Sequence, residues 1–246
     1  GTTARAVSLG SALTADSHRG LTGVYNPAGT AFLEQRHSTA GHQILSLDRQ
    51  LSCVGFTMKL PPTAGIGIAW IHAGVNHIEE RNSLGEYSGR LSIGENAFVM
   101  SFSQNIKGIF AFGLNVKIMT HALPIYGENL KGTAVGVDLG FVYKMNDFVK
   151  IGGVVQNLNA KYKWKTNSIF EETGTIYYED FPVIYKAGIK TRFEKFQIMC
   201  DAEFLTDNSF ILGKRLNGGI EYFLNENVKL RSGFGEERFG IGFGYN

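Results

Sequence analysis

The residues best suited to acid–base or metal chemistry are six histidines scattered along the 246-residue chain. His37 and His42 are five residues apart, which places them on opposite faces of a strand. Asp48 lies near both and gives the one acid–base pair worth testing. His72 and His77 fall on either side of a predicted strand end. None of these spacings groups histidine with cysteine or carboxylates, so no metal site is predicted.

Motifs for nucleophilic or cofactor chemistry are absent from the sequence. It contains no Gly-x-Ser-x-Gly elbow, phosphate-binding loop or dinucleotide fingerprint. The glycines between Gly233 and Gly244 recur every second residue, as on a strand. We therefore predict no enzyme activity and no cofactor; a membrane-barrel hydrolase whose Asp–His or Ser–His pair converges in space is the alternative. Cys53 and Cys200 are expected to be two buried free thiols, with a single disulfide as the other interpretation.

The composition favours strands over helices or disorder. The chain has 31 glycines, only 5 prolines and 12% aromatic residues. Its 24 basic and 22 acidic residues nearly balance, which argues against a nucleic-acid surface or a polybasic tail. No run of about 18 apolar residues is present, so no transmembrane helix is predicted. Gly1 resembles the start of a mature or trimmed chain, which leaves secretion open.

From about residue 37 onward, bulky and small residues alternate with period two, the pattern of strands with two different faces. Over 109–119, Phe110, Phe112, Leu114, Val116 and Ile118 face one side, whereas Ala111, Gly113, Asn115 and Lys117 face the other. The bulky face is free of charge over about 9–11 residues, the length of a membrane-spanning β-strand. The small face predicts that something packs closely against it. A soluble sandwich is the alternative, but a dry core does not readily absorb twelve such faces.

The predicted fold is all-β, an antiparallel transmembrane β-barrel of 12–14 strands. Twelve strands are predicted at 37–46, 51–60, 65–74, 97–105, 108–119, 132–144, 148–158, 183–192, 195–205, 215–224, 227–234 and 238–245. Tight connections at 105–108, 145–148, 193–195 and 224–227 alternate with long loops at 75–96, 120–131, 159–182 and 206–214, as periplasmic turns and extracellular loops do. The range extends to fourteen because 159–182 could contain a hairpin that joins Tyr162–Thr166 to Thr175–Tyr178.

Residues 1–36 lack the alternation and are predicted to form a plug, with the barrel at 37–246. This segment contains Tyr25, Asn26, Pro27, Ala28 and Gly29, where Asn-Pro followed by Ala-Gly indicates a tight reversal. A barrel of 12–14 strands has a lumen wider than its own side chains fill, so a plug is physically reasonable. A disordered leader is the alternative.

Ordered motifs resemble the FadL-type barrel superfamily, in particular its PorV/PorQ branch linked to type IX secretion. They are Ala-Arg-Ala-Val-Ser-Leu-Gly-Ser-Ala at 4–12, Gly-Val-Tyr-Asn-Pro-Ala-Gly at 23–29, Val-Val-Gln-Asn-Leu at 154–158, Phe-Pro through Lys-Ala-Gly at 181–188, and Gly-Ile-Glu-Tyr at 219–222 with Leu-Arg-Ser-Gly-Phe at 230–234. The resemblance implies 14 strands. The chain ends Gly-Tyr-Asn without the terminal aromatic residue usual for such barrels, so a last hairpin is expected to be missing.

Charged and amide side chains on the small face are predicted to point into the lumen. They either brace the plug, which we favour, or line a path for solutes; they are Lys117, Asp138, Lys144, Gln156, Asp201, Glu203 and Glu221. The long loops 75–96 and 159–182 are the expected sites for a surface partner. The aromatic residues Trp164, Tyr177 and Tyr178 are the candidate contacts there.

By resemblance, the leading hypothesis is a PorV-like barrel in the bacterial outer membrane that acts as a scaffold or shuttle for secreted or surface-attached proteins. Its partners would be membrane lipid or lipopolysaccharide, secreted or surface proteins or a translocon subunit, and no nucleic acid. The rival is a FadL-type channel for hydrophobic solutes such as fatty acids, in which residues 26–28 act as a gate. A third hypothesis is a structural anchor for a surface layer or filament.

Overall fold

The computed structural model describes residues 1–17, 20–125, 128–166, 174–207, 210–235 and 238–245. Three short helices come first: α1 (Ala4–Ser8), α2 (Thr22–Tyr25) and the 3₁₀ helix η1 (Pro27–Phe32). Fourteen strands follow: β1 (His37–Leu45), β2 (Arg49–Leu60), β3 (Ala64–Arg81), β4 (Tyr87–Ile106), β5 (Phe110–Ile125), β6 (Glu128–Lys144), β7 (Val149–Leu158), β8 (Lys161–Lys165), β9 (Ile176–Asp180), β10 (Val183–Arg192), β11 (Phe196–Asp207), β12 (Phe210–Phe223), β13 (Val228–Gly235) and β14 (Arg238–Tyr245). The predicted all-β fold and strand number are confirmed.

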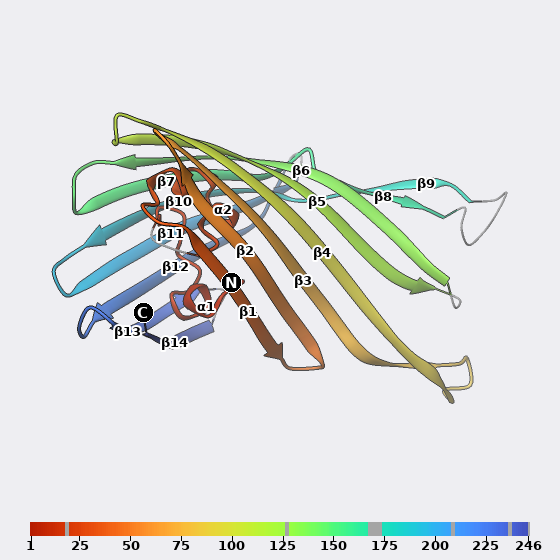
Figure 1. The fold of residues 1–246 in the computed structure, drawn as a ribbon. Helices are drawn as coiled ribbons and strands as arrows, with labels where there is room; N and C mark the ends of the chain where they lie inside the picture. The colour runs from red at the N-terminus through yellow and green to blue at the C-terminus, as the bar shows by residue number, and fades with distance from the viewer. Residues whose placement is uncertain (18–19, 126–127, 167–173, 208–209, 236–237, 246) are drawn as a thin grey trace.

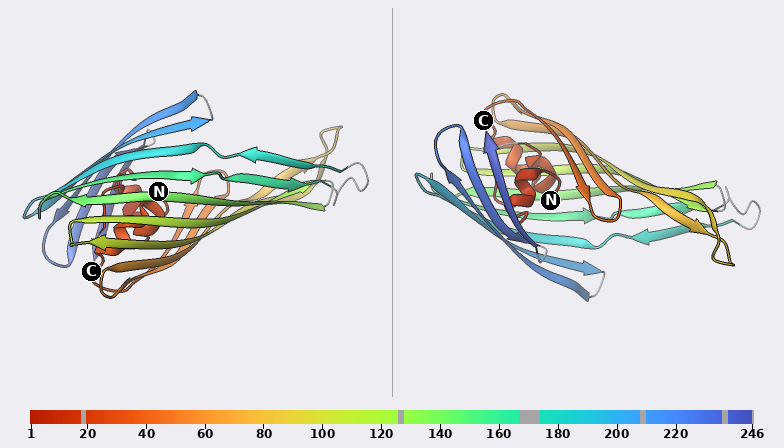
Figure 2. Two further views of the ribbon diagram at one scale, coloured as in Figure 1. Left: turned by 90° about the horizontal axis from the view of Figure 1, so that it is seen from above. Right: turned by 90° about the horizontal axis from the view of Figure 1, so that it is seen from below.

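All strands belong to one antiparallel sheet that forms a curved wall (Figure 1). Its order is β1-β2-β3-β4-β5-β6-β7-β10-β11-β12-β13-β14, and the hairpin β8–β9 joins it through β6. The helices of residues 1–36 lie in the hollow of this wall (Figure 2). Among the described residues, no strand pairing joins β1 to β14. The wall thus holds the N-terminal segment as a plug between its first and last strands.

The strands form because each alternates bulky and small residues, and the two faces meet different surroundings. In β5, Phe112, Leu114 and Ile118 are exposed on the outer face. Ala111 and Asn115 are fully buried on the inner face. The same split recurs in β14, where Phe239, Ile241, Phe243 and Tyr245 are exposed outward. The bulky face therefore points away from the plug and the small face points toward it, as predicted.

The connections at one end of the wall are tight, as predicted, and the opposite end differs from expectation. Most of the residues expected in the long loops 75–96, 120–131 and 206–214 belong to strands. For example, β3 continues to Arg81 and β4 begins at Tyr87. The alternation of apolar residues fades in these extensions, so hydrophobic periodicity no longer marks the strand. We call the two ends the tight-turn end and the long-strand end.

The hairpin predicted within 159–182 is present as β8 and β9. Lys161 pairs with Asp180 and Lys165 pairs with Ile176. A break separates β8 from β7, where Asn157 and Asn159 adopt positive φ angles of 63° and 54°. Asparagine tolerates this left-handed conformation better than most residues. The hairpin lies at the long-strand end of the wall (Figure 1).

No helix among the described residues is long and apolar enough to cross a membrane. That observation says nothing about a crossing made by strands.

Candidate functional site

Glycines on the inner face of the wall let the backbone of the plug pack directly against the backbone of the strands. A Cβ atom added to Gly113 of β5 would lie 2.4 Å from the Ala28 backbone nitrogen. One added to Gly233 of β13 would lie 2.4 Å from the Leu9 carbonyl carbon. Glycine is needed at such positions because any side chain would displace the plug backbone. The small face of the strands is therefore the seat of residues 1–36.

The first residues of the plug are attached to β2 and to α2. The Cys53 thiol donates to the Thr2 carbonyl oxygen at 3.0 Å. The Tyr25 hydroxyl accepts from the Thr2 amide at 3.0 Å. Burial raises the pKa of Tyr25, so this hydroxyl stays neutral. Thr3 caps α1 by accepting the Ala6 amide at 3.2 Å. These bonds hold the start of the plug over Cys53, which is fully buried.

Asn26, the centre of the predicted gate motif, is fully buried and bonded on both sides. Its Oδ1 accepts the Ala28 amide at 3.1 Å, which caps η1, and Pro27 is the first residue of that helix. Its Nδ2 donates to the carbonyl oxygens of Thr14 at 2.7 Å and Phe141 at 3.0 Å. One side chain thus joins two turns of the plug to β6, and the motif Tyr25–Gly29 is fixed against the wall.

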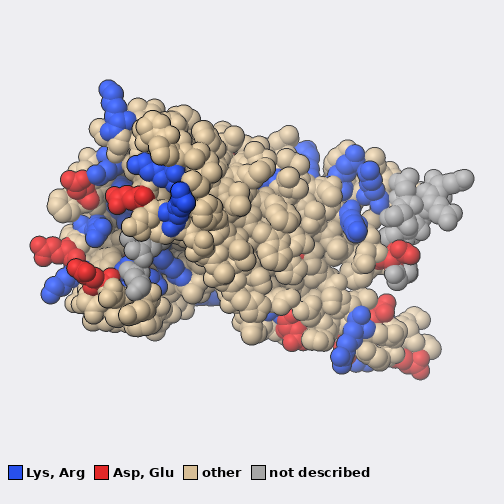
Figure 3. Space-filling model, viewed as in Figure 1, with Lys and Arg blue, Asp and Glu red and all other residues tan. Residues whose placement is uncertain are grey.

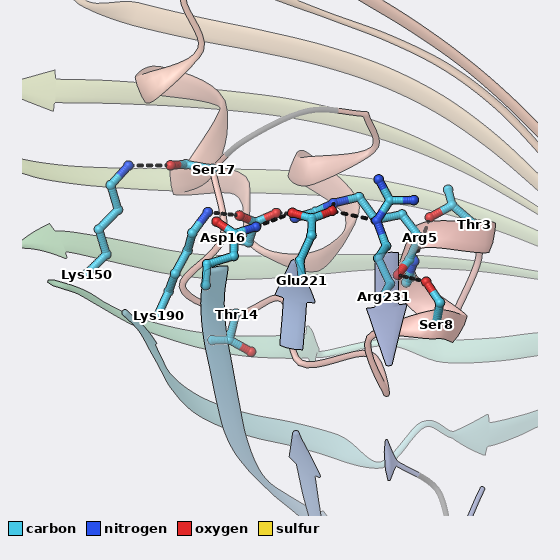
Figure 4. Close-up of polar contacts among 12 residues, drawn as sticks. Thr3, Arg5, Ser8, Thr14, Asp16, Ser17, Lys150, Lys190, Glu221 and Arg231 are labelled. Carbon is cyan, nitrogen blue, oxygen red and sulfur yellow. Dashed lines mark hydrogen bonds and ion pairs between the residues drawn. The ribbon is translucent and has the colours of Figure 1, made fainter. Parts of the chain in front are cut away.

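A buried ion-pair cluster joins the plug to the strands β10, β12 and β13 (Figure 4). Arg5 Nη1 lies 2.5 Å from Asp16 Oδ2, and Asp16 Oδ1 lies 2.6 Å from Lys190 Nζ. Glu221 Oε1 lies 2.5 Å from Arg231 Nε and 3.6 Å from Arg5 Nε. Each carboxylate therefore has two cationic partners in a region shielded from water, where removing one partner is strongly destabilising. We call these five residues the ion-pair cluster.

A second group, the amide network, holds α2 against β5, β6 and β7. Asp138 is fully buried; its Oδ1 lies 2.7 Å from Lys117 Nζ, and its Oδ2 accepts Asn115 Nδ2 at 2.9 Å. Asn115 Nδ2 also donates to the Gly23 carbonyl at 2.8 Å, and Gln156 Nε2 donates to the Val24 carbonyl at 3.2 Å. The wall and the plug share one hydrogen-bond system here.

The structure brings most of the predicted lumen residues to the plug. Lys117, Asp138 and Gln156 belong to the amide network, Glu221 to the ion-pair cluster, and Asp201 Oδ2 accepts the Thr14 amide at 2.9 Å. Glu203 instead pairs with Lys186 at 3.1 Å and with Arg215 at 3.3 Å on the wall itself. Lys144 pairs with Asp147 at 2.6 Å near the tight-turn end.

Sequence reasoning missed the plug charges and their partners. Arg5 and Asp16 are two of the few charged residues in a segment otherwise made of small and apolar residues. That contrast was the available signal, because a charge in a segment expected to be buried requires a partner. Lys190 and Arg231 point inward by strand parity, and Lys150 donates to the Ser17 hydroxyl at 2.7 Å.

The aromatic residues of the hairpin divide into a buried and an exposed group. Trp164 was expected to contact partners but is only 5% exposed, because it packs with Tyr162 on the inner face of β6 against Met119, Leu130 and Ala134. Its Nε1 donates to Glu179 Oε2 at 2.9 Å. Tyr177 and Tyr178, which are 61% and 56% exposed, remain available. Trp164 is therefore a structural anchor of the hairpin.

The one acid–base pair worth testing is not assembled as the sequence suggested. Asp48 Oδ2 lies 3.9 Å from His77 Nδ1, whereas His42 Nδ1 is bonded to the Ser52 hydroxyl at 2.9 Å. Cys53 is buried and Cys200 exposed, and both are free thiols, so the disulfide is excluded and the expected burial holds for Cys53 alone. In the part of the chain that the structure describes, no group of His, Cys, Asp or Glu could hold a metal ion.

Comparison with solved structures finds the same fold in transport proteins. The chain is similar to a Pseudomonas aeruginosa FadL homologue, with a TM-score of 0.65 and 12% identity over 94% of this chain and 79% of that one. It resembles the Pseudomonas putida toluene transporter TodX with a TM-score of 0.69 and 14% identity, over 95% of this chain and 82% of that one. It resembles the Ralstonia pickettii toluene transporter TbuX with a TM-score of 0.64 and 12% identity, over 99% of this chain and 88% of that one. At these identities the likeness establishes a FadL-like fold.

Two other comparisons gave no relative. No protein-family model matches the chain, and no curated protein matches it.

Proposed function

We propose that the protein is an outer-membrane β-barrel that serves as a protein-binding scaffold or shuttle for secreted or surface-attached proteins, as in the PorV-like branch. The membrane placement is supported by the outer face, where large apolar side chains of β3–β6 and β10–β14 are exposed. In Figure 3, charged residues gather at the two ends of the molecule and the middle band of this face is almost free of them. Such a band suits the hydrocarbon layer of a bilayer.

The observation that carries the scaffold proposal is the fastening of the plug. The ion-pair cluster, the amide network and Asn26 attach residues 1–36 to β5, β6, β7, β10, β12 and β13. Movement of the plug would separate Asp16 from Lys190 and Arg5 from Glu221. It would also break the hydrogen bonds that Asn115, Gln156 and Asn26 make between plug and wall. A barrel whose plug stays seated offers its rim and hairpin as fixed binding surfaces.

A channel for hydrophobic solutes is the second candidate, supported by two observations. The solved structures with this fold include two toluene transporters. In addition, the inner face near the long-strand end carries an apolar cluster of Met119, Leu130, Ala134, Ala160, Tyr162 and Trp164. Under this hypothesis the cluster receives the solute and the plug has to yield for the solute to pass.

The experiment that separates these candidates is purification of the tagged barrel from outer membranes in mild detergent, followed by mass spectrometry of retained proteins and lipids. The scaffold proposal expects a secreted protein, a surface protein or a translocon subunit in a stoichiometric ratio. Recovery of the barrel alone, loaded with a fatty acid or another hydrophobe, would reject the scaffold and support the channel.

A further inference from the structure

One strand of the sheet has an unpaired edge outside the apolar band. Among the described residues, β9 pairs with β8 and with no other strand. The chain runs from β9 into β10, whose neighbour on that side is β11. The last pair between them joins Val183 to Thr206, and β11 ends at Asp207, so β11 does not continue alongside β9. No strand among the described residues therefore pairs with the far edge of β9, and all five residues of β9 are exposed. In Figure 2 the hairpin lies beside β6 at one end of the wall.

The hydrogen-bond register tells which backbone groups of β9 point to the free edge. The Thr166 amide donates to the Thr175 carbonyl, and the Phe181 amide donates to the Ala160 carbonyl. In an antiparallel ladder, hydrogen-bonded pairs alternate with non-hydrogen-bonded pairs. Tyr177 and Glu179 therefore direct their backbone groups to β8. The backbone groups of Ile176, Tyr178 and Asp180 point away from β8, where an added strand would find them.

The side chains at this edge suit a strand-like occupant. Ile176, Tyr177 and Tyr178 are exposed apolar or aromatic residues of the kind that pair across strands. Exposed sheet edges are normally protected by lysine, proline or bulges, and the outer half of β9 carries none of these.

The edge is held rigidly, which lowers the entropy lost on binding. Trp164 and Tyr162 pack on β6, and the ring centroids of Tyr162 and Phe181 lie 4.8 Å apart. Lys161 Nζ and Asp180 Oδ1 are 2.8 Å apart across the two strands. The Trp164 Nε1 donates to Glu179 Oε2 at 2.9 Å, so both acidic residues of β9 are tied to β8.

We propose that the free edge of β9 binds an extended segment of the protein partner as an added β-strand. The segment has β-branched or aromatic residues opposite Ile176 and Tyr178. Main-chain hydrogen bonds supply affinity and alternate side chains supply selectivity, as in other strand-addition complexes. This inference rests on the proposed scaffold function, because a solute channel has no use for such an edge.

The test compares proline with alanine at the same position. Tyr178→Pro removes one amide that points to the free edge and leaves the ladder with β8 intact, a placement that proline tolerates in edge strands. Tyr178→Ala removes the same side chain and keeps the amide. Ile176→Pro and Ile176→Ala form a second, independent pair. Unchanged hydrogen-exchange protection of residues 161–165 reports that the hairpin remains folded in each variant.

The probe is a ten-residue peptide of alternating threonine and valine with arginine at both ends, and its control is the same peptide with proline at alternate positions. Binding to the full detergent-solubilised barrel is measured by fluorescence anisotropy. We expect each proline variant to bind about two- to tenfold more weakly than its alanine counterpart, the effect of one lost hydrogen bond. Equal affinity of the proline and alanine variants, or equal binding of the control peptide, would overturn the inference.

A second arm keeps this inference separable from the scaffold function. The Tyr178→Ala and Tyr178→Pro barrels are purified from native outer membranes and the retained surface protein is quantified. If both retain it equally, the partner binds elsewhere and only the strand-addition inference fails. If the wild-type barrel retains no protein although the peptide distinguishes proline from alanine, the edge binds strands and the scaffold function fails.

Discussion

Asn26 gives the sharpest test of how firmly the plug is held. Replacing it with alanine removes the cap of η1, which is worth about 1 kcal/mol. It also removes the hydrogen bonds to Thr14 at 2.7 Å and to Phe141 at 3.0 Å, each worth about 0.5–1.5 kcal/mol. Together these losses should destabilise the seated state of the plug by about 2–4 kcal/mol. Asn26→Asp should be worse, because it places a carboxylate against the same carbonyl oxygens.

Native Cys53 reports the opening of the plug without an added label. Its side chain is fully buried beneath Leu21, Val24 and Tyr25 of the plug, so a thiol reagent reaches it only when the plug lifts. Cys200→Ser removes the exposed thiol. A loss of about 2–4 kcal/mol raises the open fraction, and with it the labelling rate, by roughly 30- to 1000-fold.

The control is Glu34→Gln, a change at an exposed position of the same segment, which should leave the labelling rate unchanged. The result that refutes the reasoning is a labelling rate in Asn26→Ala that matches wild type. The Asn26 hydrogen bonds would then contribute nothing to seating. A rate in Asn26→Asp below that of Asn26→Ala would refute the electrostatic part of the argument.

Three further predictions concern the wall and the hairpin. Glu221→Gln leaves Arg231 without its carboxylate and Arg5 with Asp16 as its remaining one. It should cost about 3–5 kcal/mol, seen as a lower midpoint of the heat-induced gel shift. Glu203→Gln should lower that midpoint less, because its partner Arg215 is 45% exposed and screened by solvent. Gly113→Ala drives a Cβ into the plug backbone and should accelerate Cys53 labelling, whereas Gly213→Ala, with its nearest neighbour atom at 3.9 Å, should not. Trp164→Ala should cost about 3–5 kcal/mol and abolish hydrogen-exchange protection of residues 161–165, whereas Tyr177→Ala should preserve that protection.

The sequence predicts the wall well because strand parity is a local property. Once Phe112 and Leu114 are assigned to the outer face, Gly113 and Asn115 must point inward. Parity likewise directed Asp138 and Glu221 toward the plug. The order of short and long connections was predicted correctly, but most residues of the expected long loops 75–96, 120–131 and 206–214 belong to strand extensions.

The contacts that depend on distant parts of the chain could not be predicted in this way. Asp16 and Lys190 are 174 residues apart, and no local pattern specifies their meeting. The inward direction of Trp164 depends on how β8 meets β6 after the break at Asn157. A five-residue strand such as β8 has too few positions to reveal by periodicity which face it buries.

The most direct test of the central claim, that the plug stays seated while the protein works, is to retain the partner on a barrel whose plug is fixed in place. Thr2→Cys in the Cys200→Ser background puts a second cysteine at the residue whose carbonyl oxygen accepts from Cys53 Sγ at 3.0 Å. Loss of both free thiols on oxidation verifies that the disulfide has formed. Surface protein retained on the oxidised barrel is compared with that retained on the reduced barrel. We predict equal, stoichiometric retention in both states. Loss of the protein on oxidation alone would show that the plug has to move, and would contradict the account.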